Sequence, residues 1–346
     1  MKLAHLRQSW KPAVASAIDF KSCGLGASRD RVDLIIDRRS GGYRLGLFDR
    51  FRTGIVDLQG CPQLSPALEA WLQEFRRYEF PITRGSVRLR VAPNGTRGVW
   101  LDFANIDVKS LLDERTLLKK LLASGAIIEI GQRRKRLIVR DDQLKLGDAI
   151  LFPWFETYVK GAAVPLYCSI GSFTQPGFTP NRVLIDEVTA LASEVEGKGR
   201  AAEFGSGIGN FTLPLSSMFA QVDAYEVDSL ALQGLARTLL EQKRTNVTIH
   251  SGNFQGDKAL SLDFSGVDIL LVDPPRSGLM KFIEPLISAL PESRPRAIIY
   301  VSCFAESFAV DSDRLLATGY SLEKLSIVDQ FPQSRHYESV ALFLKN

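Results

Sequence analysis

Cys303 is the residue of this chain whose surroundings most clearly suggest chemistry. It follows the apolar run IIYVS (298–302), which predicts a buried strand with a thiol at its carboxyl end. Asp273, in the tetrad DPPR, follows a second apolar run, and Glu338 lies in HYESVALF near the end of the chain. A thiol and carboxylates gathered at one edge of a sheet could supply a nucleophile and a proton acceptor.

Such a pair suits methyl transfer to C5 of a pyrimidine. That carbon is a weak nucleophile toward a sulfonium methyl group, but addition of a thiolate to C6 gives it carbanion character. The C5 proton must then pass to a base before the thiol is eliminated. Cys303 is the candidate nucleophile and Glu338 the candidate base. His336, two residues away on the same face of the expected strand, is the alternative base.

A glycine-rich turn, EFGSGIGNF (203–211), follows the first expected strand of the second half. Gly205 and the two later glycines allow a sharp turn and the close approach of a ligand. The turn lacks the G-x-G-x-x-G spacing of nicotinamide sites, because Thr212 follows where the third glycine would stand. Glu226 ends the next expected strand, where an acid can accept from both ribose hydroxyls or be merely solvated.

The tetrad DPPR bears on which chemical group of the substrate accepts the methyl. Ligands of open α/β sheets bind at the carboxyl ends of the strands, so Asp273 is expected to face the crevice. Enzymes that methylate amino groups use a similar tetrad that ends in an aromatic residue, whose ring stacks on the base. Arg276 stands in that place here, which argues against amino-group methylation.

The elements that must position these residues are strands and helices in alternation. Short apolar runs at 200–205, 222–227, 247–252, 267–273 and 296–302 are separated by helical patterns. This alternation predicts a parallel sheet with helices on both faces. Two further strands, 321–331 and 337–345, follow each other closely and predict an antiparallel ending. That ending is typical of a Rossmann-like class I methyltransferase sheet rather than of a dinucleotide-binding one.

The first half has a different pattern, that of a β-rich α+β domain. Strands are expected at 32–37, 43–48, 55–58, 86–91, 97–103, 126–130 and 136–140, and helices at 64–78 and 107–123. A linker rich in Gly, Pro and Ser covers 160–180, and Asn181 is expected to cap the helix that follows. We therefore predict an RNA-recognition domain at 1–165 and a methyltransferase domain at 166–346.

Charge supports this division of labour. Residues 1–160 carry 28 Lys and Arg against 18 Asp and Glu, whereas residues 161–346 carry 15 against 21. A basic half joined to an acidic half suggests that the first holds a polyanion and the second acts on it. No run approaches the roughly 20 apolar residues of a membrane span, and the N-terminus makes a poor signal peptide. We expect a cytoplasmic monomer without membrane contact.

Four ordered motifs resemble the RNA 5-methyluridine methyltransferase family, whose members act on a uridine of tRNA or large-subunit rRNA: GNFTLPL (209–215), DPPRSGL (273–279), YVSC (300–303) and DQFPQSRHYESVALF (329–343). The segment SFTQPGFTPN (172–181) resembles the one that precedes the family's sheet. The resemblance implies S-adenosyl-L-methionine as cofactor, a structured RNA as partner and a flipped-out target uridine.

The resemblance also assigns roles to single residues. It implies Cys303 as the nucleophile and Glu338 as the proton acceptor. Cofactor contacts are implied for Gln175, Asn210, Glu226 and Asp273, and we add Gly205 from the glycine turn.

Three departures from the family pattern limit what is carried over. Many rRNA-modifying members hold an iron–sulfur cluster on four cysteines, but only Cys61 fits that pattern, so we expect no cluster and no other metal site. Many members begin with a small β-barrel domain, for which residues 1–20 are too few. Relatives often carry an aromatic residue and a cysteine where this chain has Gly205 and Ser206.

Three alternatives remain open. A methyltransferase for an exocyclic amine or a protein side chain would need no nucleophile, so Cys303→Ala would leave it active. A non-catalytic RNA-binding relative would keep the sheet as a scaffold and fail to bind the cofactor. A nicotinamide dehydrogenase conflicts with the missing third glycine and with the antiparallel ending.

Overall fold

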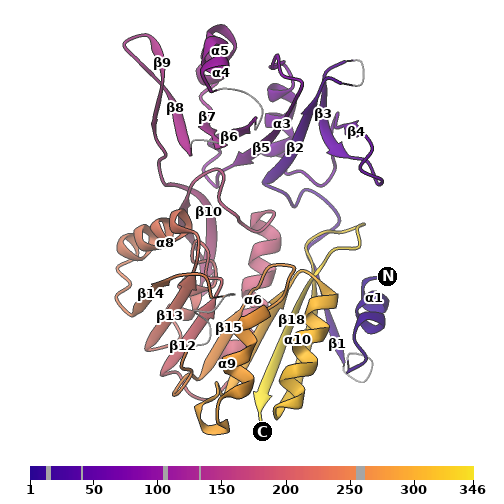
Figure 1. The fold of residues 1–346 in the computed structure, drawn as a ribbon, viewed down its shortest axis with the longest axis vertical. Helices are drawn as coiled ribbons and strands as arrows, with labels where there is room; N and C mark the ends of the chain where they lie inside the picture. The colour runs from indigo at the N-terminus through magenta and orange to yellow at the C-terminus, as the bar shows by residue number, and fades with distance from the viewer. Residues whose placement is uncertain (13–16, 40–41, 104–107, 132–133, 255–261) are drawn as a thin grey trace. The chain divides into compact units, whose positions relative to one another are not determined.

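The computed structural model describes the chain except for residues 13–16, 40–41, 104–107, 132–133 and 255–261. It divides the chain into two compact units. Unit 1 contains Met1–Leu25, Glu156–Leu166 and Thr179–Asn346, and unit 2 contains Gly26–Phe155 and Tyr167–Phe178. Figure 1 labels their elements.

Unit 1 is built on one sheet, whose strand order in the described residues is β1-β17-β18-β16-β15-β12-β13-β14. The strands are β1 (Ile18–Ser22), β12 (Arg200–Phe204), β13 (Gln221–Glu226), β14 (Val247–Ser251), β15 (Ile269–Val272), β16 (Ala297–Ser302), β17 (Tyr320–Asp329) and β18 (Glu338–Lys345). The strands β12 to β16 run parallel to one another, and β18 runs antiparallel to both β16 and β17. The predicted sheet with its antiparallel last strand is therefore confirmed.

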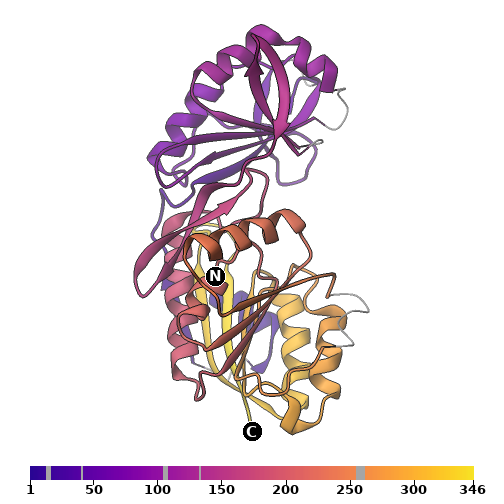
Figure 2. The same cartoon turned by 90° about the vertical axis from the view of Figure 1, so that its left-hand side faces the viewer.

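Helices cover both faces of this sheet. They are α1 (Lys2–Ser9), α6 (Phe178–Glu194), α7 (Thr212–Ser216), α8 (Ser229–Glu241), α9 (Ile283–Ser288) and α10 (Ala305–Ala317), with 3-10 turns at Met280–Phe282 and Pro291–Ser293. Side chains of α9 and α10 belong to one buried cluster and those of α6 to another, so the strands lie between two cores. Figure 2 shows α6 on one side of the strands and α9 and α10 on the other.

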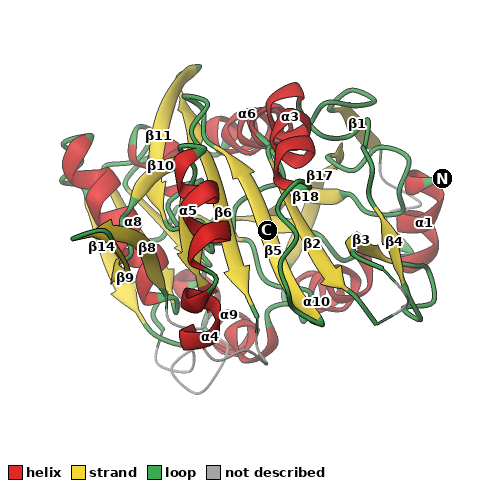
Figure 3. Cartoon of the chain, turned by 90° about the horizontal axis from the view of Figure 1, so that it is seen from above, coloured by secondary structure: helices red, strands yellow, loops and turns green. Residues whose placement is uncertain are grey.

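Unit 2 is a largely antiparallel sheet in the order β4-β3-β2-β5-β6-β7-β8-β9. The strands are β2 (Arg31–Asp37), β3 (Arg44–Phe48), β4 (Ile55–Asp57), β5 (Arg84–Val91), β6 (Arg97–Asp102), β7 (Ile127–Ile130), β8 (Lys135–Arg140) and β9 (Gln143–Asp148). The helices α3 (Pro66–Phe75), α4 (Val108–Asp113) and α5 (Arg115–Ala123) contribute to the buried cluster of this unit. Figure 3 shows α3 and α5 on the same side of the sheet.

The units do not follow a single division of the chain. The first 25 residues lie in unit 1 because β1 pairs in parallel with β17. Residues 167–178 lie in unit 2, so its chain is likewise discontinuous. The strands β10 (Phe152–Val159) and β11 (Ala162–Cys168) pair with each other and carry the chain from one unit to the other. None of the helices among the described residues is long and apolar enough to cross a membrane.

Candidate active site of unit 1

The thiol of Cys303 stands one residue beyond the end of β16 and is half-buried. Burial, and after it the nearby carboxylates of Glu338 and Asp273, raise its pKa to about 11. The positive charge of Arg276 acts in the opposite direction and lowers this pKa. These electrostatic contacts bring together the thiol, both acids and the arginine that the sequence singled out.

Glu338 is placed by the antiparallel strand β18, which lies between β16 and β17. It is the first residue of β18, and its neighbour Ser339 pairs with Ser302 of β16. Because the two strands run in opposite directions, the start of β18 lies at the carboxyl end of β16, beside Cys303. Glu338 is buried, and burial together with the charge of Asp273 raises its pKa well above that of an ordinary glutamate.

His336, the alternative base, lies outside β18 and is exposed. Its backbone N–H donates to Ser334 Oγ at 3.1 Å, and its ring lies edge-on to that of Phe331. The sequence-based placement of both residues on one strand face was therefore wrong, because β18 begins only at Glu338. The burial and the acid neighbours of Glu338 favour it as the base.

The loop that carries Asp273 and Arg276 is fixed at both ends. At its start, the Asp273 N–H donates to the Phe204 carbonyl at 3.2 Å. At its end, the Leu279 N–H donates to the carboxylate of Asp311 on α10 at 2.8 Å, and the Tyr300 hydroxyl donates to the same oxygen at 2.7 Å. Burial raises the pKa of Asp273 to about 7. Two acids of raised proton affinity, Asp273 and Glu338, therefore act on the thiol of Cys303.

The glycine turn has the shape that a backbone-bound ligand requires. Gly205 has φ +79°, and a Cβ there would lie 2.9 Å from the Asp273 carbonyl oxygen, so only glycine fits without displacement. A Cβ on Gly207 would meet no atom within 4 Å, which leaves open space over the middle of the turn. The turn is therefore closely packed at Gly205 and open at Gly207.

Glu226 stabilises this turn and keeps limited capacity for a ligand. Its Oε2 accepts from the Gly207 N–H at 2.9 Å, and its Oε1 accepts from the N–H groups of Val227 and Asp228 at 2.6 and 2.8 Å. A carboxylate has about four acceptor positions. Three are used by the backbone, so about one, on Oε2, is left for a ribose hydroxyl.

Asn210 is engaged within unit 1. Its side-chain amide exchanges hydrogen bonds with that of Asn181 at 2.8 and 2.9 Å, and its carbonyl accepts from Thr157 Oγ1 at 2.6 Å. Asn181 lies inside α6, which begins at Phe178, so the expected helix cap at Asn181 was wrong. The Asn181–Asn210 pair instead joins the start of α6 to the glycine turn.

Gln175 belongs to unit 2, where it is buried and lines a depression with Arg31, Arg90 and Trp154. Its role as a cofactor contact stays a prediction. Among the described residues, no group of three or more His, Cys, Asp or Glu is arranged to hold a metal ion.

Glu203 is a site residue that the sequence reasoning missed. It lies on β12, two residues before Gly205, and is fully buried. Burial raises its pKa to about 8, although the Thr212 hydroxyl donates to its Oε2 at 2.6 Å; its Oε1 has no partner among the described residues. An acid inside the apolar run RAAEFG was the available signal.

Comparison with known proteins places these features in a family. The family model described as tRNA (uracil-5-)-methyltransferase matches residues 158–346. An uncharacterized RNA methyltransferase of Bdellovibrio bacteriovorus is 45% identical over 327 residues, which are 93% of this chain and 82% of the relative. A 23S rRNA (uracil(1939)-C(5))-methyltransferase of Shewanella frigidimarina is 28% identical over 336 residues, which are 92% of this chain and 69% of the relative.

One solved structure shares the fold over almost the whole chain. It is the tRNA (uracil-54, C5)-methyltransferase of Pyrococcus abyssi in complex with S-adenosyl-L-homocysteine. The TM-score is 0.69 at 18% identity, and the match covers 99% of this chain and 83% of that one.

Proposed function

The chain belongs to the tRNA (uracil-5-)-methyltransferase family and is an RNA uracil-C5 methyltransferase; we propose that it works through a covalent bond between Cys303 Sγ and C6 of a uridine in tRNA or rRNA. The observation that supports this mechanism best is the thiol of Cys303 beside Glu338, Asp273 and Arg276 at the carboxyl edge of the sheet. An amine methyltransferase would have no use for such a thiol.

Cys303 supplies the nucleophile. Its thiolate adds to C6, so an S–C bond forms and electron density moves to C5. Arg276, the neighbour that lowers the pKa of this thiol, would stabilise the thiolate. S-Adenosyl-L-methionine supplies the methyl group that C5 takes up, and its sulfur retains the electron pair of the broken bond.

Glu338 completes the reaction as the base. It removes the C5 proton, the C5–C6 double bond re-forms, and the S–C6 bond breaks to release the thiolate. A carboxylate whose pKa is raised by burial is a stronger base than an ordinary glutamate. Asp273, with a pKa of about 7, would hold the base or the cofactor in place.

The glycine turn and Glu226 are the proposed cofactor contacts on unit 1. The open space over Gly207 suits the approach of a nucleoside, and the remaining acceptor position of Glu226 suits one ribose hydroxyl. Gly205 and Asn210 would act through the shape of the turn, since the Asn210 amide is already paired with Asn181. Gln175 stays proposed as a cofactor contact on the resemblance of its segment, SFTQPGFTPN, alone.

Two variants test the mechanism with RNA from a strain that lacks the gene. Cys303→Ala should abolish formation of 5-methyluridine while calorimetry still detects binding of S-adenosyl-L-methionine. Glu338→Gln should accumulate a protein–RNA adduct that survives denaturing electrophoresis, because the C5 proton is no longer removed. Cys61→Ala, which changes a thiol of unit 2, is the matched control and should retain full activity. Turnover by Cys303→Ala would refute the covalent mechanism and favour amine methylation.

A further inference from the structure

The hairpin of β3 and β4 in unit 2 exposes aromatic and apolar side chains at its end. Phe51 at the tip is 78% exposed and Phe48 is 41% exposed. Leu47 and its cross-strand partner Val56 are also exposed, whereas Ile55, opposite Phe48, is buried. Exposed rings on a short hairpin have no role in the core of unit 2, so a surface function has to account for them.

The tip that carries Phe51 has a defined conformation. The Asp49 carboxylate accepts from the N–H groups of Phe51 and Thr53, both at 2.9 Å, and from the Thr53 hydroxyl at 2.7 Å. The Asp49 N–H donates to the Gly54 carbonyl at 3.0 Å and closes the loop. Arg52 adopts φ +58°, a left-handed conformation that a non-glycine residue keeps only where its neighbours impose it.

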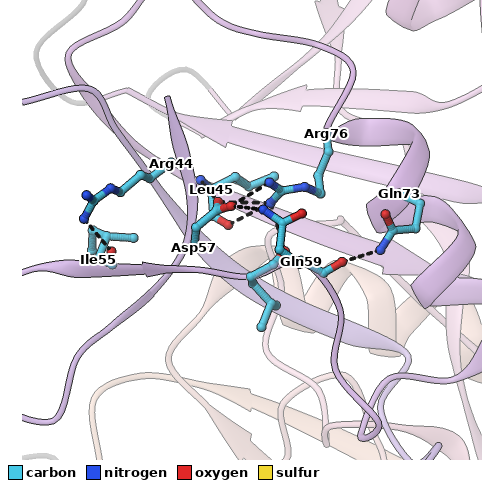
Figure 4. A network of polar contacts seen from close by, with 8 residues as sticks. Arg44, Leu45, Ile55, Asp57, Gln59, Gln73 and Arg76 are labelled. Carbon is cyan, nitrogen blue, oxygen red and sulfur yellow. Dashed lines mark hydrogen bonds and ion pairs between the residues drawn. The ribbon is translucent and has the colours of Figure 1, made fainter. Parts of the chain in front are cut away.

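The base of the hairpin is clamped to α3, as Figure 4 shows. Arg76 donates from two nitrogens to the carboxylate of Asp57 at 2.7 and 3.1 Å, and Asp57 also accepts from the Leu45 N–H at 2.8 Å. Arg44 donates across the hairpin to the Ile55 carbonyl at 3.3 Å. The tip is therefore ordered before a ligand binds, so that binding loses little conformational entropy of the protein.

Positive charge surrounds the two rings. The guanidinium of Arg84 lies 5.4 Å from the centre of the Phe48 ring, and that of Arg50 lies 5.8 Å from the centre of the Phe51 ring. Arg50, Arg52 and Arg84 are exposed. Arg84 stands opposite Asp37 on the neighbouring strand, and its charge contributes to the lowered pKa of that carboxyl. The acid of the tip, Asp49, points its oxygens into the loop instead.

From these observations we infer that the β3–β4 tip binds an unpaired stretch of the RNA, with bases stacked on Phe51 and Phe48 and phosphates paired with Arg50, Arg52 and Arg84. Exposed aromatic faces interleaved with arginines are the surface that single-stranded nucleic acid recognises. The excess of Lys and Arg over Asp and Glu in residues 1–160, 28 against 18, favours a polyanion over a protein partner. The inference rests on the proposed function only for the choice of RNA as partner.

Fluorescence anisotropy of the full chain tests the inference with a labelled 12-nucleotide RNA of mixed sequence, alone and annealed to its complement. Loss of one base stack costs about 1.4 kcal/mol, so Phe51→Ala should weaken binding of the single strand about 10-fold. Binding of the duplex, whose bases are already stacked, should change less than about twofold. Arg50→Ala should weaken both and lower the salt dependence of single-strand binding, by about 0.7 in the log–log slope for one phosphate contact.

Two controls separate stacking from other effects. Phe51→Trp keeps a ring and should bind the single strand at least as well as the parent chain. Phe20→Ala removes a ring that is 47% exposed on β1 of unit 1 and should leave binding unchanged. Equal binding by Phe51→Ala and the parent, or equal loss for single strand and duplex, would overturn the inference and favour a protein partner or plain charge. The assay involves no methyl transfer, so a failed catalytic proposal would leave its result standing.

Discussion

Arg276→Met is the change that most directly probes the electrostatics of the thiol. In the parent chain the Cys303 pKa of about 11 leaves about one thiol in a thousand ionised at pH 8. A hydrogen bond from a charged donor contributes about 1.5–3 kcal/mol where it is dry. Arg276 is exposed, so water screens its charge, and about 1 kcal/mol is a better value. That energy corresponds to about 0.7 of a pKa unit, or about fivefold less thiolate.

Alkylation by iodoacetamide measures the thiolate directly. The rate at Cys303, read by mass spectrometry of its peptide between pH 7 and 10, should rise about tenfold per pH unit in both proteins, because both pKa values lie above this range. At each pH, the alkylation rate of Cys303 in Arg276→Met should be about fivefold lower than in the parent. Arg276→Lys keeps the charge and should recover most of the difference. Cys61, half-buried in unit 2, is the internal reference and should react equally in all three proteins.

The reasoning fails if Cys303 in Arg276→Met reacts as fast as in the parent at every pH. The guanidinium would then not stabilise the thiolate, and its place in the tetrad would concern RNA alone. A loss of methylation without a change in alkylation would point the same way, because substrate binding would be the step affected.

Three further tests concern Glu203, the glycine turn and the ion pair of Lys2 with Asp329. The pKa of Glu203 is raised from 4.5 to about 8. Its contribution to the free energy of unfolding is therefore complete below pH 4.5 and is lost as the pH rises to about 8. The loss amounts to about 1.4 kcal/mol for each pH unit in that range. Glu203→Gln should flatten that dependence in urea unfolding between pH 5 and 8. Gly205→Ala should lower stability by about 1–3 kcal/mol, because its Cβ meets the backbone, whereas Gly207→Ala, which meets nothing, should cost about 1 kcal/mol or less in thermal unfolding. Lys2→Met should cost about 1–3 kcal/mol in the same assay, because it leaves the half-buried carboxylate of Asp329 without this partner, and Lys2→Arg should cost less.

The parallel strands β12 to β16 of unit 1 could be located from sequence because they are short apolar runs separated by helical patterns. The strand β1 could not be found in the same way. Its sequence, IDFKS, alternates weakly, and its residues are half-buried or exposed at the sheet edge. Only the pairing of Ile18 to Ser22 with β17 makes it a strand, and that pairing joins residues 307 positions apart, as in Ile18 with Leu325. The strand β9 was missed for a related reason, since none of its residues is fully buried.

The site could be predicted as far as it depends on strand ends. Asp273 and Cys303 follow parallel strands, so their common edge follows from the pattern. The electrostatic effect of Arg276 on the thiol depends on side-chain placement beyond the strand, which no periodicity encodes. The pairing of Asn210 with Asn181 likewise depends on how α6 packs. Asn181, which was expected to cap the helix, instead connects α6 to the glycine turn.

The raised pKa values around Cys303 lead us to expect that its thiolate forms more readily once the cofactor is bound. Glu338, Asp273 and Glu203 all have raised pKa values, and burial is the first cause in each case. Arg276 is the cation that opposes these shifts at Cys303 and Glu338, and it lies exposed at the rim. A sulfonium bound over the glycine turn would bring a second positive charge into this low-dielectric space and would lower the proton affinity of each acid and of the thiol. Thiolate would then form mainly when the methyl donor is present, which protects Cys303 from unproductive addition and from oxidation between turnovers.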